Sequence, residues 1–223
     1  MSLAGSPPGW LRPILDAVSD VRAEQLSRHA PPEPGAGRAS AVLALLGESR
    51  RAGRMVPDVL LIERAHSLRN HAGTPAFPGG IIDPGDDGPV GAALREAKEE
   101  TGLDLAGVDV LATLPSLWLP AGGYVVTPVL AWWREPSPVR VVDTAEVASV
   151  HRVLLADLVD PANRLRVRHP SGYVGPAFRI DGLLVWGFTA GVLGWLLDVA
   201  GLARPWDRTR VELLPLAEGA ERR

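Results

Sequence analysis

The chain has 223 residues, of which 46% are hydrophobic and 22% are charged, and its formal net charge is −3. This length and composition predict one globular domain with its own core, and the slight negative charge argues against a nucleic-acid partner. The absence of cysteine excludes disulfides, thiolate metal sites and a cysteine nucleophile.

The first 37 residues read as a tail, a helix and a linker. Apolar residues recur at helical spacing from Trp10 to Leu26, which predicts an amphipathic helix at about residues 13–28. The Pro- and Gly-rich segment 29–38 predicts a linker that is neither helix nor strand. We therefore divide the chain into an N-terminal part (1–37), a main domain (38–203) and a C-terminal tail (204–223).

Short runs of β-forming residues follow, separated by turns and helical segments. The expected strands cover residues 39–46, 59–63, 108–114, 124–133 and 147–153, with a hairpin of 166–169 and 173–180. The charged segment 48–54 predicts a turn, a loop is expected at 115–123, and a short helix is expected near 154–158. Pro128 predicts an edge or bulge position in its strand. This mixture predicts an α/β fold with a mixed β-sheet between α-helices.

A nearly continuous apolar run at residues 183–203 is long enough to cross a bilayer. However, Asp198 interrupts it, and glycines 187, 191 and 194 punctuate it. We therefore predict a strand at 183–186 and a buried helix at about 189–199, in a soluble protein without a membrane partner. No basic segment followed by an apolar run stands at the N-terminus, so we expect a cytoplasmic location.

The strongest functional signal is the stretch 77–103, FPGGIIDPGDDGPVGAALREAKEETGL. It predicts a glycine turn, an acidic loop and a helix on which Glu96, Glu99 and Glu100 share one face. Three like charges near a helix C-terminus repel one another unless a cation neutralises them, and carboxylate oxygens suit Mg²⁺ or Mn²⁺. The alternative is a solvated acidic face with an ordinary i, i+4 pair between Arg95 and Glu99.

Basic residues stand immediately before this stretch. Arg64, Arg69 and His71 follow the expected strand at 59–63, in a segment dense in polar residues. Such side chains suit phosphate groups, and arginine can bind them by bidentate contacts. The alternative is a polar surface loop that follows a strand.

The stretch 77–103 resembles the Nudix box. The matching residues are Gly80, Arg95, Glu96, Glu99, Glu100 and Gly102. Three features depart from that pattern: the spacing from Gly80 to Arg95 is one residue longer than is commonest, the acidic loop residue is Asp87 or Asp86 rather than Glu, and residue 97 is alanine. The longer loop leaves the register of residues 83–87 open.

The sequence around the box is similar to that of the coenzyme A pyrophosphatases, a Nudix subfamily. Its upstream pattern LL…R…LR.H.G…FPGG is matched by Leu60, Leu61, Arg64, Leu68, Arg69, His71, Gly73 and residues 77–80. Downstream, residues 114–129, 146–147 and 185–190 look like its LP…G…VTPV, EV and IWG.TA segments. The resemblance covers about residues 38–200.

The resemblance implies a Nudix fold and hydrolysis of the diphosphate in coenzyme A or acyl-coenzyme A, with Mg²⁺ or Mn²⁺ as cofactor. The products would be 4′-phosphopantetheine, or its acyl form, and adenosine 3′,5′-bisphosphate. The partner is then a small molecule, and the oligomeric state, a homodimer included, is left open. Rival hypotheses are a Nudix hydrolase of ADP-ribose or NADH, a non-catalytic Nudix-like binding module, and a structural domain with an acidic helix.

The same resemblance suggests a role for each site residue. We expect Glu96 and Glu100 to be the principal metal ligands, Glu99 to be a further ligand or to orient the water, and Arg95 to hold Glu99. Two further candidates are the Gly80 carbonyl, as a metal ligand, and Glu146, as a base or extra ligand, although Glu146 could equally be a surface residue before a strand. The expected substrate contacts are Arg64, Arg69, His71 and Trp118, and Trp118 could instead pack on the core.

Overall fold

The computed structural model describes residues 6–26, 37–68, 71–120 and 122–214. Its strands are β1 Arg38–Arg51, β2 Arg54–Arg64, β3 Pro75–Ala76, β4 Gly79–Ile81, β5 Val108–Thr113, β6 Leu117–Leu119, β7 Tyr124–Trp133, β8 Val147–Leu154, β9 Arg164–Arg168, β10 Val174–Ile180, β11 Leu183–Trp186 and β12 Val211–Leu213. Its α-helices are α1 Arg12–Val18, α2 Ala23–Leu26, α3 Gly88–Thr101, α4 Leu155–Val159 and α5 Gly187–Val199. Short 3₁₀ turns cover Gly9–Leu11, Leu105–Gly107 and Pro161–Asn163.

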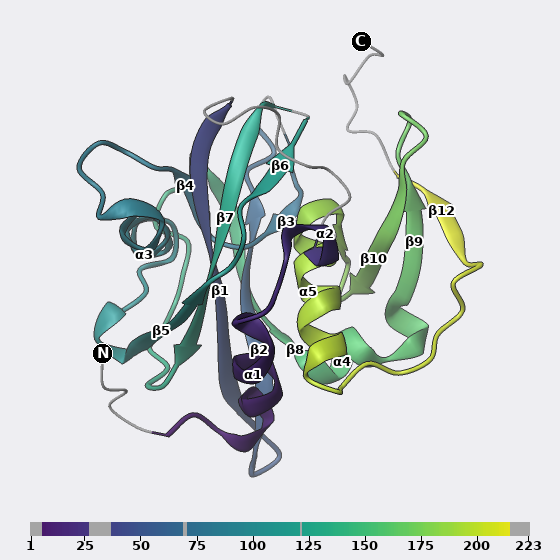
Figure 1. Ribbon diagram of the computed structural model, residues 1–223, viewed down its shortest axis with the longest axis horizontal. Helices are drawn as coiled ribbons and strands as arrows, with labels where there is room; N and C mark the ends of the chain where they lie inside the picture. The colour runs from purple at the N-terminus through teal and green to yellow at the C-terminus, as the bar shows by residue number, and fades with distance from the viewer. Residues whose placement is uncertain (1–5, 27–36, 69–70, 121, 215–223) are drawn as a thin grey trace.

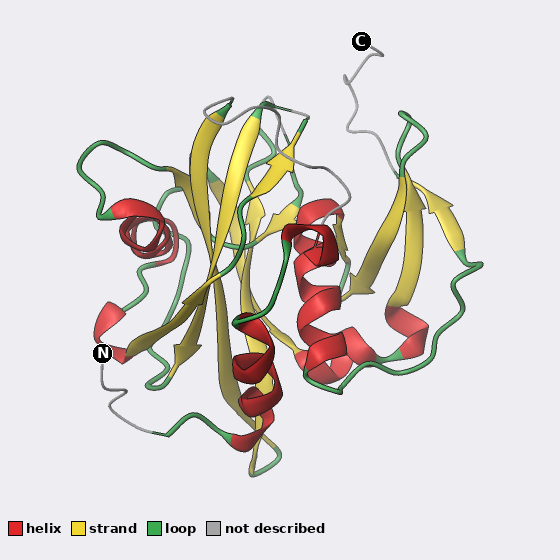
Figure 2. Cartoon of the chain, in the orientation of Figure 1, coloured by secondary structure: helices red, strands yellow, loops and turns green. Residues whose placement is uncertain are grey.

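Two β-sheets form the frame of the molecule, and helix α5 lies between them (Figure 1). The larger sheet has eight strands, with the order β3-β2-β1-β7-β5, and β4, β6 and β8 are added beside β1, β7 and β2. The β1–β7 pair is parallel, whereas the other pairs of this sheet are antiparallel. The smaller sheet has the order β11-β10-β9-β12. The predicted mixed sheet is therefore present, and Figure 2 shows helices on both of its faces.

The central strand β1 supplies both faces of the core. Leu43 and Leu45 pack with α3 on one face, whereas Ala44 and Leu46 pack with α1 and α5 on the other. Successive side chains of a strand point to opposite faces, so one apolar run can fill two layers. The sheet is consequently sandwiched between helices, which confirms the predicted fold class.

The predicted N-terminal helix is broken in two. Helix α1 ends at Val18, and α2 begins only at Ala23. Ser19 donates its hydroxyl to the Asp16 carbonyl, and Asp20 closes a turn to Ala17. Short polar side chains of this kind compete with the helical backbone for hydrogen bonds. The end of the predicted helix at 27–28 and most of the predicted linker, residues 29–36, lie outside the described residues.

The turn predicted at residues 48–54 is wrong, because the two strands continue through most of it. Strand β1 runs to Arg51 and β2 starts at Arg54, so the connection consists of Ala52 and Gly53 alone, both with positive φ. Two such residues make the tight turn that matches the twist of a hairpin. The ladder is supported by the buried Asp58, which pairs with Arg152 at 2.8 Å.

Pro128 does not mark an edge or a bulge as predicted. Strand β7 is interior, flanked by β1 on one side and by β6 and β5 on the other. Leu114, between β6 and β5, donates its N–H to the Pro128 carbonyl at 2.9 Å. The nitrogen of Pro128 faces the same edge of β7 as its carbonyl, at the point where the strand paired with β7 changes from β6 to β5. The missing N–H of proline therefore removes no hydrogen bond of the sheet.

The smaller sheet is formed by the C-terminal third of the chain. The predicted hairpin appears as the antiparallel pair β9–β10, and the predicted strand at 183–186 appears as β11. The expected C-terminal tail contains β12, which pairs in parallel with β9, and the division of the chain at residues 37 and 203 stays a prediction. Among the helices of the described ranges, none has the length and apolarity needed to cross a bilayer.

Candidate active site

Helix α3 lies close against the larger sheet because its inner face carries alanines. Ala93 and Ala97 are fully buried between the helix and the sheet. A small residue at position 97 therefore brings the helix backbone near the strands. The helix ends at Gly102, whose φ of 69° is left-handed and whose N–H bonds to the Lys98 carbonyl; glycine adopts this capping conformation without strain.

Three carboxylates from two distant parts of the chain meet at this helix. Ligand oxygens of Glu96, Glu100 and Glu146 all lie within 4.8 Å of one another. The pairing of β8 with β2 brings Glu146 there, and the Glu146 carbonyl accepts a hydrogen bond from the Ala65 N–H at 2.7 Å. We call these three residues the carboxylate cluster.

Glu100 is the most deeply buried member of the carboxylate cluster, with 2% of its surface exposed. Its Oε2 accepts a hydrogen bond from the Gly79 N–H at 3.0 Å, whereas its Oε1 has no hydrogen-bond partner. Burial raises the pKa of Glu100 to about 8, and the charges of Glu96 and Glu146 add to this effect. The site thus holds a buried acceptor that protein groups leave unsatisfied.

The carboxylate of Glu96 lies against the glycine turn formed by Gly79 and Gly80. A Cβ atom on Gly80 would lie 2.4 Å from Glu96 Oε1, so only glycine leaves room for this carboxylate. Burial raises the pKa of Glu96, and the neighbouring Arg95, which donates to Glu96 at 3.0 Å, opposes that rise. A Cβ on Gly79 would lie 2.3 Å from the Ala41 carbonyl, so the turn also packs tightly on β1.

Arg95 holds the acidic loop and the helix together. Its guanidinium donates to both oxygens of Asp86, at 2.9 and 3.0 Å, and to Glu99 at 3.0 Å. The hydrogen bonds from Arg95 lower the pKa of Asp86. Asp86 is therefore the loop residue that contacts the arginine, while Asp87 stands at the N-cap of α3.

The structure brings most of the proposed site residues to one groove. The groove is lined by Gly80, Glu96 and Glu146 together with Arg64, His71 and Trp118. Glu99 is not in the carboxylate cluster, and its side chain is 58% exposed and paired with Arg95. Arg69 lies outside the described residues.

Of the residues that the smaller sheet adds to this groove, the sequence pointed to Trp186, within the segment 185–190, but not to the others. The others include Arg164, Arg166, His169 and Tyr173. The one available signal was the alternation of arginine with apolar residues in RLRVR, residues 164–168. That pattern predicts a strand with one basic face but does not say what the face meets.

The carboxylate cluster fits a divalent cation. Its donors are all hard carboxylate oxygens, which suit Mg²⁺ or Mn²⁺ better than softer metals. The unsatisfied Oε1 of Glu100 is a buried ligand atom that a cation would satisfy. Burial, together with the charges of Glu96 and Glu146, raises the pKa of Glu100, and a bound cation would favour its charged form.

A cluster of hard oxygen ligands beside a glycine turn is able to hold a divalent cation, which can neutralise phosphate groups of a substrate. A family model of the NUDIX domain matches residues 37–173. The chain therefore belongs to the Nudix family. It is an enzyme, a Nudix hydrolase that acts on small-molecule derivatives of nucleoside diphosphates, and hydrolases of this family generally use divalent metal ions.

Relatives of known name agree with this assignment. The chain is 37% identical over 147 residues to the uncharacterized Nudix hydrolase NudL of Escherichia coli (strain K12), a match that covers 63% of this chain and 73% of that protein. The NudL protein of Shigella boydii serotype 4 matches with the same identity and coverage. The crystal structure of RenU, a Nudix hydrolase from M. smegmatis, has the same fold, with a TM-score of 0.51, 22% identity and coverage of 77% of this chain and 90% of that chain.

Proposed function

We propose that this enzyme hydrolyses the diphosphate of coenzyme A or acyl-coenzyme A. The observation that supports it is the position of Arg64 and His71. Both belong to the sequence pattern of the coenzyme A subfamily, and both line the groove together with Glu96 and Glu146 of the carboxylate cluster. Basic groups beside the cluster suit a substrate that carries several phosphates.

For the cofactor we propose Mg²⁺ or Mn²⁺, held by Glu96, Glu100 and Glu146 with the Gly80 carbonyl as a further ligand. A divalent cation, when bound, neutralises the diphosphate and lowers the pKa of a coordinated water. The chain itself supplies the ligand geometry: Gly79 fixes Glu100, and Arg95 fixes Glu96. These side chains are therefore aligned before the substrate arrives.

Two carboxylates outside the pair Glu96 and Glu100 have different proposed roles. Glu146 lies in the carboxylate cluster, which favours a ligand role over that of a distant base. Glu99 is held on the solvent side by Arg95, where it could orient a water or become a further ligand. Exchange of Glu99 for glutamine tests whether Glu99 is a metal ligand.

The substrate-binding side of the proposal rests on Arg64 and Trp118. Arg64 lines the groove with Glu96, and its charge opposes the rise in the pKa of Glu100, which supports a contact with the diphosphate. Trp118 is half-buried and packs close to Gly37, where a Cβ atom would lie 2.6 Å from the indole ring. We propose that its groove-facing part contacts the pantetheine arm, while the other part packs against the backbone.

A substrate panel tests the proposed function. The purified protein with Mg²⁺ or Mn²⁺ is given coenzyme A, ADP-ribose or NADH, and the products are separated by chromatography. We expect the largest kcat/KM for coenzyme A, with 4′-phosphopantetheine and adenosine 3′,5′-bisphosphate as products. Glu100→Gln serves as the control for contaminating hydrolases. Equal kcat/KM values for coenzyme A and ADP-ribose would reject the coenzyme A assignment and leave the Nudix assignment intact.

The same assay tests the role of Arg69. If Arg69 contacts a phosphate that ADP-ribose lacks, Arg69→Ala should reduce the preference for coenzyme A about tenfold or more, as expected for the loss of a charged hydrogen bond. An unchanged ratio of kcat/KM values would reject that role alone.

A further inference from the structure

Helix α5 presents a face without side chains to the groove. Gly187, Gly191 and Gly194 recur with helical spacing, Asp198 continues the row, and all four line the groove. No atom lies within 4 Å of a Cβ built on Gly187 or Gly194, whereas a Cβ on Gly191 would lie 3.3 Å from the Leu26 carbonyl oxygen of α2. Gly187 has a left-handed φ of 62°, which favours glycine, but Gly194 lies inside the helix, where glycine costs about 1 kcal/mol relative to alanine. The fold therefore leaves space beside Gly194 at a cost in helix stability.

An unpaired buried charge lies at the far end of this face. Arg164 is 5% exposed, and its guanidinium lies over the rings of Phe178 and Trp206, 4.9 Å from each centroid. Its Nε and Nη1 have no hydrogen-bond partner, and no described residue forms an ion pair with it within 4.0 Å. Burial lowers the pKa of Arg164. A buried guanidinium with unused donors is costly unless an anion satisfies it.

The surroundings of Arg164 are predominantly basic. The other arginines that line this end of the groove are Arg166, Arg204 and Arg208. Arg208 lies over the Trp206 ring, 5.8 Å from its centroid, and its charge repels that of Arg164. Among the described groove residues of α5 and the smaller sheet, Asp198 is the one carboxylate, and it attracts Arg164 without reaching ion-pair distance. The positive charge at this end thus exceeds the negative charge.

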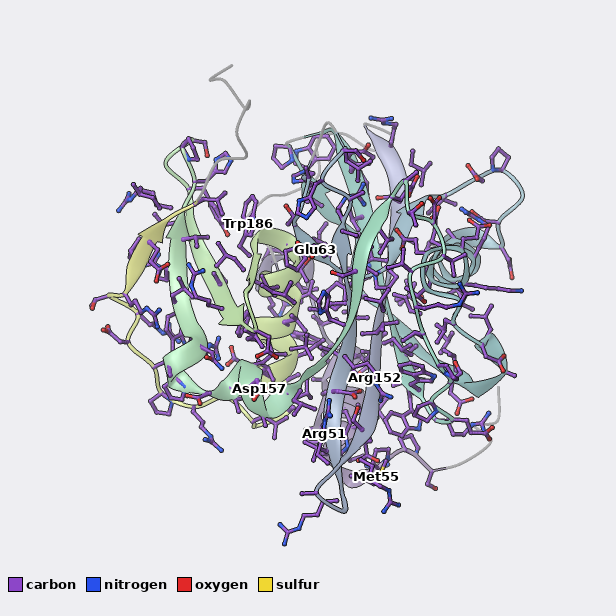
Figure 3. The ribbon with its side chains drawn as sticks, turned by 180° about the vertical axis from the view of Figure 1, so that it is seen from behind. Arg51, Met55, Glu63, Arg152, Asp157 and Trp186 are labelled. Carbon is purple, nitrogen blue, oxygen red and sulfur yellow. The ribbon has the colours of Figure 1, made fainter. Side chains whose placement is uncertain are left out.

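The groove connects this basic end with the carboxylate cluster. Strand β11, which leads into α5, packs against β3, and β3 pairs with β2 next to Arg64. In the view of Figure 3, Trp186 of β11 and Glu63 of β2 lie toward the same end of the two sheets, and Asp157 lies toward the opposite end. Asn163, which precedes Arg164, donates to the Asp157 carbonyl at 3.0 Å. From Gly187 to Asp198 the helix rises about 16 Å, at 1.5 Å per residue.

We propose that Arg164, with Arg166, Arg204 and Arg208, forms an anion subsite for the terminal carboxylate of a dicarboxylic acyl group, and that the glycine face of α5 admits the chain that carries it. This inference rests on the proposed function, because in an acyl-coenzyme A the pantetheine arm separates the acyl end from the diphosphate. The 3′-phosphate is bound to the ribose next to the diphosphate, so it does not span the groove when the diphosphate lies at the carboxylate cluster. A guanidinium recognises a carboxylate by paired, charge-assisted hydrogen bonds.

Two substrate pairs test this assignment. Succinyl-coenzyme A is compared with acetyl-coenzyme A, and coenzyme A with dephospho-coenzyme A, by kcat/KM. We expect a preference of about tenfold or more for succinyl-coenzyme A, since one buried charged hydrogen bond contributes on this scale. A preference for coenzyme A over dephospho-coenzyme A that depends on Arg208, without a preference for succinyl-coenzyme A, would contradict the assignment.

Variants around Arg164 connect that preference to the subsite. Arg164 itself stacks on two rings, so its replacement could disturb folding, and the exposed Arg208 is the better target. Arg208→Gln should reduce the preference several-fold, and Asp198→Asn should increase it because a competing carboxylate is removed. The matched control is Arg168→Gln, which changes an exposed arginine of β9, the strand of Arg164, that is not among the residues lining the groove. If Arg164 only balanced Asp198, Asp198→Asn would lower the melting temperature and leave the preference unchanged.

A binding measurement separates failure of this inference from failure of the proposed function. Inorganic phosphate is titrated into the metal-free protein, and the melting temperature is followed. We expect a stabilisation that Arg208→Gln weakens and Asp198→Asn strengthens. If no coenzyme A derivative is cleaved, the proposed function fails, and this titration alone decides the subsite. The subsite is rejected if neither the substrate pairs nor the phosphate titration responds to Arg208→Gln.

Discussion

Asp86 and Glu100 are two largely buried carboxylates of the same site, yet their environments are opposite. Asp86 accepts two hydrogen bonds from the Arg95 guanidinium, which lowers its pKa. Glu100 receives one backbone N–H and faces two other carboxylates, and burial raises its pKa to about 8. The protein neutralises the first carboxylate with its own cation and leaves the second without one.

This difference shows that one part of the site stabilises the fold, whereas the other part is arranged to bind a ligand. Arg95 ties the acidic loop to the helix with charges that the protein supplies, so this part is complete without a ligand. The carboxylate cluster is held in place by glycine turns and strand pairing, although its members repel one another. A cation is therefore expected to complete only the second part, and the following predictions test that separation.

The largest effect is expected from replacing Glu100 or Glu96 by glutamine. Each exchange keeps the size of the side chain and removes a ligand charge, so kcat/KM should fall by about 10²-fold or more at saturating metal. Circular dichroism and melting temperature confirm that the variants fold. Near-unchanged turnover by a folded Glu100→Gln protein would show that Glu100 is not a ligand of the catalytic metal.

The metal-free protein should lose stability as the pH rises from about 5 to about 8. The pKa of Glu100 is raised from 4.5 to about 8 in the folded state, so folding takes up a proton in this window. Its contribution to stability is full below about pH 4.5 and is lost as the pH approaches 8. The expected slope is at most about 1.4 kcal/mol per pH unit for one group.

Urea unfolding in the presence of a chelator, at several pH values, measures that slope. Glu100→Gln should flatten it, because glutamine does not titrate. Mg²⁺ or Mn²⁺ should also flatten it, since the cation replaces the proton on the carboxylate. An equal slope in the wild type and in Glu100→Gln would show that another group controls the pH dependence.

A smaller effect is expected from Gly80→Ala. The new Cβ would lie 2.4 Å from Glu96 Oε1, the far end of a flexible side chain, so the carboxylate should move while the backbone remains. We expect kcat/KM to fall about tenfold, because a slightly displaced Glu96 carboxylate should still bind the metal ion, but with poorer geometry. The melting temperature should change little. Gly85→Ala, in the acidic loop with open space around its Cβ, is the matched control. Equal activities of the two variants would contradict the close approach of Gly80 to Glu96.

The smallest effect is expected from Glu99→Gln. This side chain is 58% exposed and pairs with Arg95 rather than with the carboxylate cluster. Exposed pairs contribute little to stability, so the melting temperature should hardly change, and kcat/KM should fall less than in Glu100→Gln. Activity losses as large as those of Glu100→Gln would place Glu99 among the metal ligands of the working enzyme.

The sequence was informative where function depends on local spacing. Glu96 and Glu100 share a helix face because they are four residues apart, and a left-handed cap at the end of that helix requires a residue such as Gly102. The strands at 124–133 and 183–186 also follow from local composition, and the structure confirms their bounds. Such features depend on dihedral angles and side-chain periodicity within a few residues.

Tertiary structure alone decided what the local pattern leaves open. Glu146 joins the carboxylate cluster only because β8 pairs with β2. Asp86, rather than Asp87, meets the guanidinium because the acidic loop folds back over α3. Arg164 and the glycine face of α5 form one groove with the carboxylate cluster because the smaller sheet packs beside that helix. Contacts between residues distant in sequence depend on the closure of long loops and on packing, which the order of residues within one segment does not encode.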